Sequence, residues 1–194
     1  MKNNVINVLD RELSCYPDGI FPEGERRETI QYGLCEVNRT TLEIMRTVSI
    51  PVKPVLSRIS PLCTELTGWT YAKLMKQGVY DKEAIRRLTD RHGSRNRLVV
   101  TDSCKELSSM QKQCLATGVE YPFGDETLNI SHWFTLVTGV TRNLSLEKKL
   151  AYLGLSFEGT PHRADVDAYN IARLLIALIK QGRQGLPADR LIIS

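Results

Sequence analysis

A short β-branched run near the start of the chain leads directly into two acidic residues. Val5 to Leu9 reads Val-Ile-Asn-Val-Leu, and such a run is typical of a buried central strand. Asp10 and Glu12 follow at alternate positions, and alternate residues of a strand project to the same side of a sheet. Two carboxylates on one side repel each other unless a cation lies between them. An isolated Asp-x-Glu is more often an ordinary solvated strand end, so the pair alone does not define a site.

A second polar group stands at the head of the last expected helix. His162 follows the loop-like sequence Gly-Thr-Pro, and Asp167 comes five residues later, near the start of a helix that we expect over 165–180. An acidic residue in a first helical turn is stabilised by the helix dipole whether or not it binds metal. A histidine beside such a loop is also often structural. Taken singly, each of these residues favours a structural role.

Composition indicates one globular domain. The chain has 194 residues, of which 42% are hydrophobic and 25% are charged, and we assign 1–182 to a single domain and 183–194 to a C-terminal tail. The net charge of +4 is too small to indicate nucleic acid by itself, although it allows a basic rim around an acidic site. The five cysteines are odd in number and lack Cys-x-x-Cys spacing, which argues against a disulfide framework or a zinc cluster.

Nothing in the sequence indicates a membrane protein. No N-terminal segment has the pattern of a signal peptide, and no apolar stretch approaches the roughly 18 residues that span a bilayer. We therefore expect a cytoplasmic protein that has reduced thiols and no membrane partner.

Hydrophobic patterning predicts an α/β fold, in which an antiparallel meander is followed by further helices and strands. Strands are expected over 5–9, 29–37, 42–52 and 98–100. Helices are expected in pieces over 60–88, then over 106–118, 144–155 and 165–180. Residues 16–27 are expected to form a surface loop. The prediction is a mixed sheet flanked by helices.

Taken together, the acidic fragments and their order resemble the DEDDh class of 3′-to-5′ exonucleases, which have an RNase H-like fold. The resemblance covers roughly residues 4 to 180 and extends to segments other than the acids. These are Leu66-Thr67-Gly68-Trp69-Thr70, which is similar to the family's LTGIT; Tyr152 to Leu155, which precedes Phe157 to Thr160; and His162-Arg163-Ala164-x-x-Asp167-Ala168. Within the class, Leu9 to Cys15 and Gln113-Cys114 are most similar to the Eri-type and KapD-like branch, which trims RNA 3′ ends.

The middle acidic motif departs from that branch. A Trp-Gly-x-x-Asp segment commonly stands there, with a cysteine eight residues after the aspartate. Counting back from Cys114 gives Glu106 in a gap-free register, whereas a shifted register makes Asp102 the ligand. We favour Glu106, because the gap-free register keeps 98–101 and 113–114 in place. Either way the expected aspartate is missing, and a glutamate extends the carboxylate by one methylene.

The resemblance implies a site for two Mg²⁺ or Mn²⁺ ions. Asp10 would bridge the two ions, Glu12 and Asp167 would complete the first, and Glu106 would reach the second. His162 would be the catalytic base that takes a proton from the attacking water. The expected substrates are single-stranded RNA or DNA 3′ ends, with RNA favoured, and the products are nucleoside 5′-monophosphates. Leu13 and Ser14 would contact the base and sugar of the terminal nucleotide.

Two other interpretations keep part of this pattern. The chain could retain the nuclease fold as a nucleic-acid-binding module whose altered middle motif has impaired turnover. It could also be unrelated to nucleic acid, as a metal-dependent phosphatase or a scaffold with scattered surface acids. The order of the motifs argues against the last of these.

Overall fold

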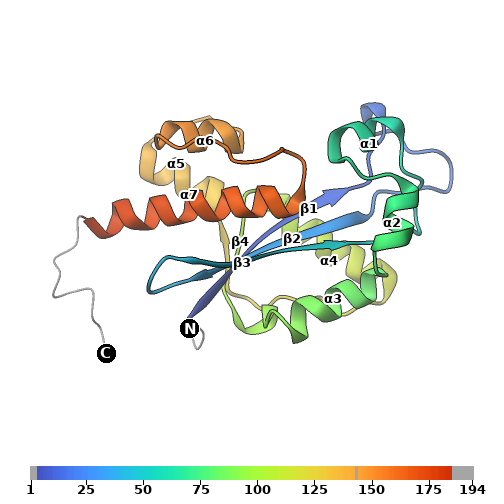
Figure 1. Cartoon of the computed structure of the whole chain (residues 1–194), viewed down its shortest axis with the longest axis horizontal. Coiled ribbons are helices and arrows are strands. Elements are labelled where there is room, and N and C mark those ends of the chain that lie inside the picture. Colours follow the sequence, from blue (N-terminus) through green and yellow to red (C-terminus); the bar gives the residue numbers. More distant parts are fainter. Residues whose placement is uncertain (1–3, 143, 185–194) are drawn as a thin grey trace.

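The strands form one mixed sheet. The computed structural model describes residues 4–142 and 144–184, and within them the sheet has five strands in the order β3-β2-β1-β4-β5 (Figure 1). The strands are β1 (Val5–Leu13), β2 (Thr29–Asn38), β3 (Ile44–Pro51), β4 (Val99–Thr101) and β5 (Thr127–Asn129). β1 pairs antiparallel with β2, and β2 with β3, whereas β1 with β4 and β4 with β5 are parallel pairs. The predicted mixed sheet with its antiparallel meander is confirmed.

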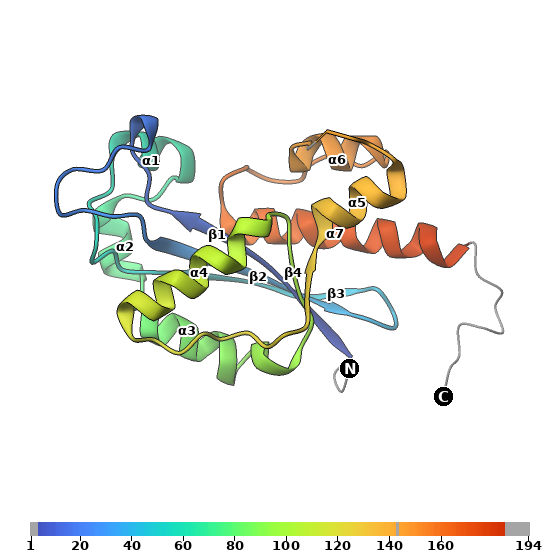
Figure 2. The ribbon, with the colours of Figure 1, turned by 180° about the vertical axis from the view of Figure 1, so that it is seen from behind.

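Helices cover both faces of this sheet. The helices are α1 (Pro61–Thr67), α2 (Tyr71–Gln77), α3 (Asp81–Asp90), α4 (Cys104–Thr117), α5 (Ile130–Thr138), α6 (Leu146–Tyr152) and α7 (Ala164–Gln184), with short 3-10 turns η1 (Pro17–Gly19) and η2 (Ser94–Asn96). The long helix α7 crosses one face, with α5 and α6 beside it (Figure 1). α3 and α4 cover the opposite face, which Figure 2 shows from behind.

Alternation along β1 sends its side chains into two separate cores. Ile6 and Val8 are buried with Ile171 of α7, whereas Leu9 is buried with Met110 of α4. Burying an aliphatic side chain of this size stabilises the fold by about 1.5–3 kcal/mol. The two acidic residues at the end of β1 continue the α7 face, and the arginine between them continues the α4 face.

The structure differs from the predicted elements in three places. β1 continues to Leu13, so the acidic residues lie inside the strand and not after it. β5 and α5 were not predicted, because β5 has three residues and α5 consists largely of β-branched and aromatic residues, which are weak helix formers. The side chain of Asn129 caps α5 by accepting a hydrogen bond from the His132 amide, and Phe134 anchors the helix in the core.

The third difference is at the end of α7. The helix continues through Gln184, so it includes the first two residues of the segment that we assigned to the tail. Arg183 donates hydrogen bonds to the carbonyl oxygens of Arg39 and Thr40, which join the helix end to the β2–β3 turn. The rest of the expected tail, 185–194, lies outside the described residues. Across the described part of the chain, no helix combines the length and hydrophobicity needed to cross a membrane.

Candidate active site

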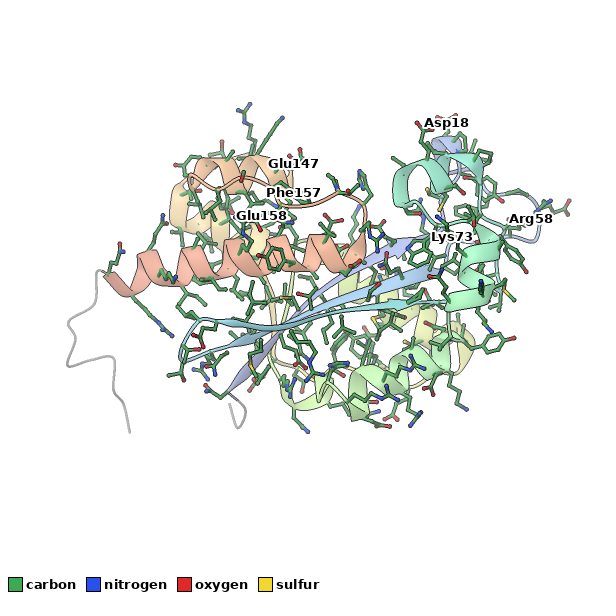
Figure 3. All side chains as sticks on the ribbon, viewed as in Figure 1. Asp18, Arg58, Lys73, Glu147, Phe157 and Glu158 are labelled. Carbon is green, nitrogen blue, oxygen red and sulfur yellow. The ribbon has the colours of Figure 1, made fainter. Side chains whose placement is uncertain are left out.

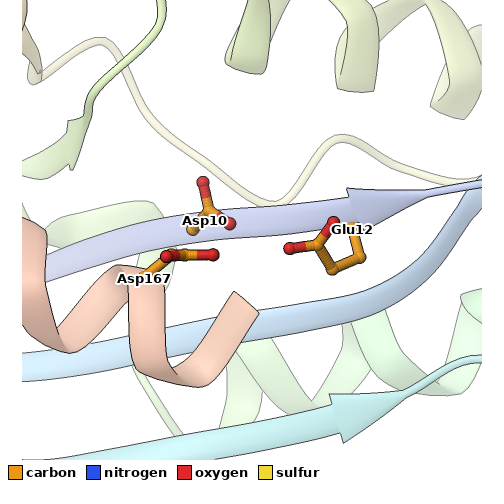
Figure 4. Close-up of side chains that lie close together, drawn as sticks. All are labelled: Asp10, Glu12 and Asp167. Atoms are coloured by element: carbon orange, nitrogen blue, oxygen red, sulfur yellow. The ribbon is translucent and has the colours of Figure 1, made fainter. Parts of the chain in front are cut away.

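β1 and α7 bring three carboxylates together. Asp10 and Glu12 project from the same side of β1, and Asp167 projects from the first turn of α7 (Figure 4). One carboxylate oxygen from each lies within 4.8 Å of the others, and all three side chains are half-buried. The structure therefore joins three of the four predicted metal ligands in one group, which we call the carboxylate cluster.

The cluster concentrates negative charge where water is scarce. Burial raises the pKa of Asp10 well above its usual range, and the charges of Glu106, Glu12 and Asp167 raise it further. Burial and the charges of Asp167 and Glu106 raise the pKa of Glu12 to about 8. Burial also raises the pKa of Asp167 to about 6, although the charge and backbone N–H of His162 act in the opposite direction.

A divalent cation fits this environment. Three half-buried carboxylates that resist ionisation are stabilised by a positive charge between them, and the donor set consists of oxygen atoms alone. Mg²⁺ and Mn²⁺ prefer such ligands. The cluster has neither the thiolate nor the imidazole ligands that are typical of structural zinc sites.

Gly33 allows α7 to reach the cluster. It pairs with Asp10 across the β1–β2 ladder, and a Cβ at this position would lie 1.9 Å from the carbonyl carbon of Ala164. Real side chains essentially never approach so closely, so the start of α7 can rest on β2 only at a glycine. Sequence reasoning missed this residue, although a glycine in the interior of a strand is a signal of close backbone approach.

Gln31 holds the same junction through hydrogen bonds. Its side-chain oxygen accepts from the backbone N–H of Ala164 at 3.3 Å and from the indole N–H of Trp69 at 2.9 Å. Its side-chain nitrogen donates to Asp165 Oδ1 at 2.8 Å. Gln31 thus connects β2, the segment after α1 and the first turn of α7, and it was not among the predicted site residues.

His162 borders the cluster from the loop before α7. Its backbone has a φ of 62°, in the left-handed region that non-glycine residues rarely adopt. The side chain is exposed, and the effect of its charge on Asp167 places it close to that carboxylate. This position suits a group that exchanges protons with solvent.

The two candidates for the middle acid have different surroundings. Glu106 lies in the first turn of α4, and its charge raises the pKa of both Asp10 and Glu12. Asp102 accepts hydrogen bonds at 2.6 and 2.8 Å from the Nζ of Lys149, whose side chain is 2% exposed. Among the carboxylates whose charges raise the pKa of Asp10, Asp102 has the weakest effect. Neither residue belongs to the group of three carboxylates, so the choice of Glu106 as the middle ligand stays a prediction.

Leu13 and Ser14 differ in accessibility. Leu13 is half-buried and lines a cavity of about 230 Å³ together with Arg26, Arg27 and Lys112. Ser14 is fully buried, and its hydroxyl accepts a hydrogen bond from the backbone N–H that follows the surface loop. Ser14 therefore fastens the end of β1 to that loop, and its expected contact with a sugar stays a prediction.

The sheet order and the position of its acids define the class of protein. The central strand of this mixed sheet carries two carboxylates, and the helix that packs on the same face carries a third. This is the arrangement of an RNase H-like nuclease fold. A sequence profile of the family described as Exonuclease (RNase_T) matches residues 8–175. The chain belongs to this exonuclease family.

Individual relatives agree with this assignment. The chain is 27% identical to 3′-5′ exoribonuclease 1 of Homo sapiens, over 91% of this chain and 53% of that protein. It is 28% identical to ERI1 exoribonuclease 3 of Bos taurus, over 90% of this chain and 53% of that protein. The chain thus spans about half the length of the curated relatives that it matches.

Solved structures show the same fold. The nuclease domain of 3′hExo, described as a DEDDh family member bound to rAMP, superimposes with a TM-score of 0.83 at 25% identity and covers 93% of this chain and 94% of that one. A full-length 3′-exonuclease gives a TM-score of 0.83 at 25% identity, over 92% of this chain and 61% of that one. The resemblance to the DEDDh class and its Eri-type branch is therefore confirmed.

Proposed function

We propose that this chain is a metal-dependent exonuclease that removes nucleotides one at a time from RNA 3′ ends and releases nucleoside 5′-monophosphates. The observation that carries the proposal is the carboxylate cluster of Asp10, Glu12 and Asp167, whose three residues all lie within the segment that matches the exonuclease family. The names of the relatives support RNA as the substrate, because they describe 3′-5′ exoribonucleases.

The acids would hold two divalent ions between them. Asp10 would contact both ions, Glu12 and Asp167 would complete the first, and Glu106 would contribute to the second. Bound Mg²⁺ or Mn²⁺ supplies Lewis acidity at the scissile phosphate and lowers the pKa of a coordinated water. The half-buried cluster contributes by holding its carboxylate oxygens in place before substrate arrives.

His162 would take the proton from the attacking water. Its exposed ring borders Asp167 without belonging to the carboxylate cluster, so it can accept a proton from the reaction and pass it to solvent.

The nucleic acid would approach past the end of β1. Leu13 directly follows the cluster residue Glu12, and the cavity that it lines includes the cationic side chains of Arg26, Arg27 and Lys112. Exposed cations of this kind attract backbone phosphates in a manner that depends on salt but not on sequence. Leu13 would then pack against the terminal base, and the cationic side chains would bind the phosphates that follow it.

The proposal is tested by incubating the protein with matched 3′-overhang RNA and DNA in Mg²⁺, Mn²⁺ or EDTA. We expect ladders of single-nucleotide steps that are stronger on RNA and are lost in EDTA and in Asp10→Asn. Asp18→Asn is a matched control, because Asp18 lies at the tip of the surface loop (Figure 3) and its φ of 57° is tolerated by asparagine. Equal cleavage in EDTA, or full activity of Asp10→Asn, would contradict the proposal.

One observation favours a second function. Both candidates for the middle acid bind a basic side chain: Glu106 with Arg11, and Asp102 with Lys149. If neither carboxylate is free for an ion, the protein is a nuclease-fold module that binds RNA without cutting it. Metal-dependent binding of RNA with no ladder, in the same assay, would support this module.

A further inference from the structure

Arg11 stands between two cluster residues in the sequence, but its side chain lies on the other face of the sheet. Strand alternation directs Asp10 and Glu12 toward α7 and Arg11 toward α4. The Arg11 side chain is 1% exposed. A guanidinium so deeply buried is stable only with several hydrogen-bond partners.

Those partners come chiefly from the first turns of α4. The Nε of Arg11 donates to Glu106 Oε1 at 2.6 Å, and Nη2 donates to the backbone oxygen of Glu106 at 2.7 Å. Nη2 also donates to Ser109 Oγ at 2.5 Å, and Nη1 donates to Thr29 Oγ1 at 3.0 Å. Arg11 therefore donates hydrogen bonds to both the side chain and the backbone of Glu106, and it fixes that residue relative to β1 and β2.

The contact can act in two opposite ways. A guanidinium on Glu106 could neutralise the carboxylate and weaken it as a ligand for a cation. It could instead hold the flexible side chain in one orientation, since the bond uses Oε1 and a carboxylate can offer its other oxygen to a cation. The two hydrogen bonds from Arg11 to Glu106 favour the second effect. Because they fix both the backbone and the carboxylate of Glu106, this residue loses little further conformational entropy when it binds an ion.

We propose that Arg11 is a positioning residue that holds Glu106 toward the carboxylate cluster as a ligand of the second divalent ion. This inference rests on the proposed function, in which Glu106 contributes to that ion. Arg11, which is itself a cation, is not a ligand of the ion.

The test is calorimetric titration of Mn²⁺ in the presence of AMP, which measures ion binding without turnover. We expect two binding events in the unmodified protein. Arg11→Met should leave the tighter event unchanged and weaken the second by roughly 10- to 100-fold, the usual effect of removing a group that orients a metal ligand. Arg11→Lys should give an intermediate result, because lysine keeps the charge but loses the paired geometry of arginine.

Two further variants separate positioning from general stability. In Glu106→Gln, we expect Arg11→Met to weaken the second event little further, because both changes remove the same interaction. Arg58→Met is the matched control, since Arg58 donates from Nε to Glu25 Oε1 at 2.7 Å and lies on an outer loop (Figure 3). It should leave both events unchanged. If a thermal scan shows that Arg11→Met is not folded, the comparison is made with Arg11→Lys instead.

The outcomes separate this inference from the proposed function. A single binding event in the unmodified protein, or a second event that is unchanged or tighter in Arg11→Met and Arg11→Lys, would overturn the role of Arg11 even if the protein degrades RNA. Failure of the unmodified protein to degrade RNA, with two intact binding events that respond to Arg11, would overturn the nuclease proposal alone.

Discussion

Gly33 and Ala164 are in contact through their backbones, and this contact sets the distance between the two halves of the carboxylate cluster. Gly33 lies opposite Asp10 in the sheet, and Ala164 begins the helix that carries Asp167. A Cβ on Gly33 would lie 1.9 Å from both the carbonyl carbon and the carbonyl oxygen of Ala164. The start of α7 therefore meets β2 at a position where the strand has no side chain.

Gly33→Ala should separate Asp167 from Asp10. The new methyl group meets backbone atoms, which cannot rotate away, so α7 must move outward at its first turn. We expect a loss of about 1–3 kcal/mol in the free energy of unfolding, as for other overpacked sites, together with weaker Mn²⁺ binding and loss of RNA cleavage. Chemical denaturation and Mn²⁺ titration measure the two effects.

Gly182→Ala is the control for that change. Gly182 lies in α7 with no atom within 4 Å of the position of a Cβ, so alanine should be neutral or should stabilise the helix by about 1 kcal/mol. If Gly33→Ala binds Mn²⁺ as tightly as Gly182→Ala does, Gly33 does not control the cluster.

The stability of the metal-free protein should fall as pH rises. Burial and neighbouring charges raise the pKa of Asp167 to about 6 and that of Glu12 to about 8, so the folded state holds these protons more tightly than the unfolded chain does. The stabilising contribution is complete below the unfolded pKa values near 4, and it is lost as pH rises through about 6 and then about 8. We expect the Tm in EDTA to drop on the order of 5 °C between pH 5 and pH 8.5.

Mn²⁺ should reverse this fall, because a bound cation stabilises the ionised cluster, so the rise in Tm on adding Mn²⁺ should be larger at pH 8 than at pH 5. In Asp10→Asn the Tm measured in EDTA should fall less steeply with pH, because one of the mutually repelling carboxylates is gone. A Tm in EDTA that does not change between pH 5 and pH 8.5 would show that ionisation of the cluster does not destabilise the fold.

His162→Ala should slow cleavage without weakening ion binding. The ring is exposed and lies outside the group of three carboxylates, so its removal leaves the ligands in place. We expect kcat to fall by about 10²- to 10⁴-fold, as for other catalytic bases, with little change in the Mn²⁺ titration. His132→Ala, which removes another exposed histidine, is the control. Full activity of His162→Ala would exclude the base role.

The sequence predicted those parts of the site that depend on local pattern. The run before Asp10 and the spacing of His162 and Asp167 placed a strand and a helix correctly, because hydrophobic alternation and helical periodicity are local properties. Nothing local shows that Gly33 supports Ala164, since the two residues are 131 positions apart in the chain. Such contacts are decided only when the sheet and the helix pack.

The partner of Arg11 also could not be predicted from the three residues Asp10, Arg11 and Glu12 alone. The pattern Asp-Arg-Glu places the arginine between two acids, where a simple charge argument predicts that it neutralises them. Strand alternation instead carries it to the opposite face, where its partner is Glu106, 95 residues away. The choice between Glu106 and Asp102 stayed open for the same reason, because the partner of each acid comes from a distant segment.

That choice is decided by comparing Asp102→Asn with Glu106→Gln. Asp102→Asn leaves the ammonium group of Lys149 without its anionic partner in a site where the lysine is 2% exposed, and breaking a buried pair in this way costs about 3–5 kcal/mol. We therefore expect Asp102→Asn to lower the Tm strongly and to leave Mn²⁺ binding intact. Glu106→Gln also removes the anionic partner of a buried cation, Arg11, so it should lower the Tm as well. Only Glu106→Gln should also weaken the second Mn²⁺ event. If Asp102→Asn removes that event and Glu106→Gln does not, Asp102 is the middle ligand, and the shifted register is the correct one.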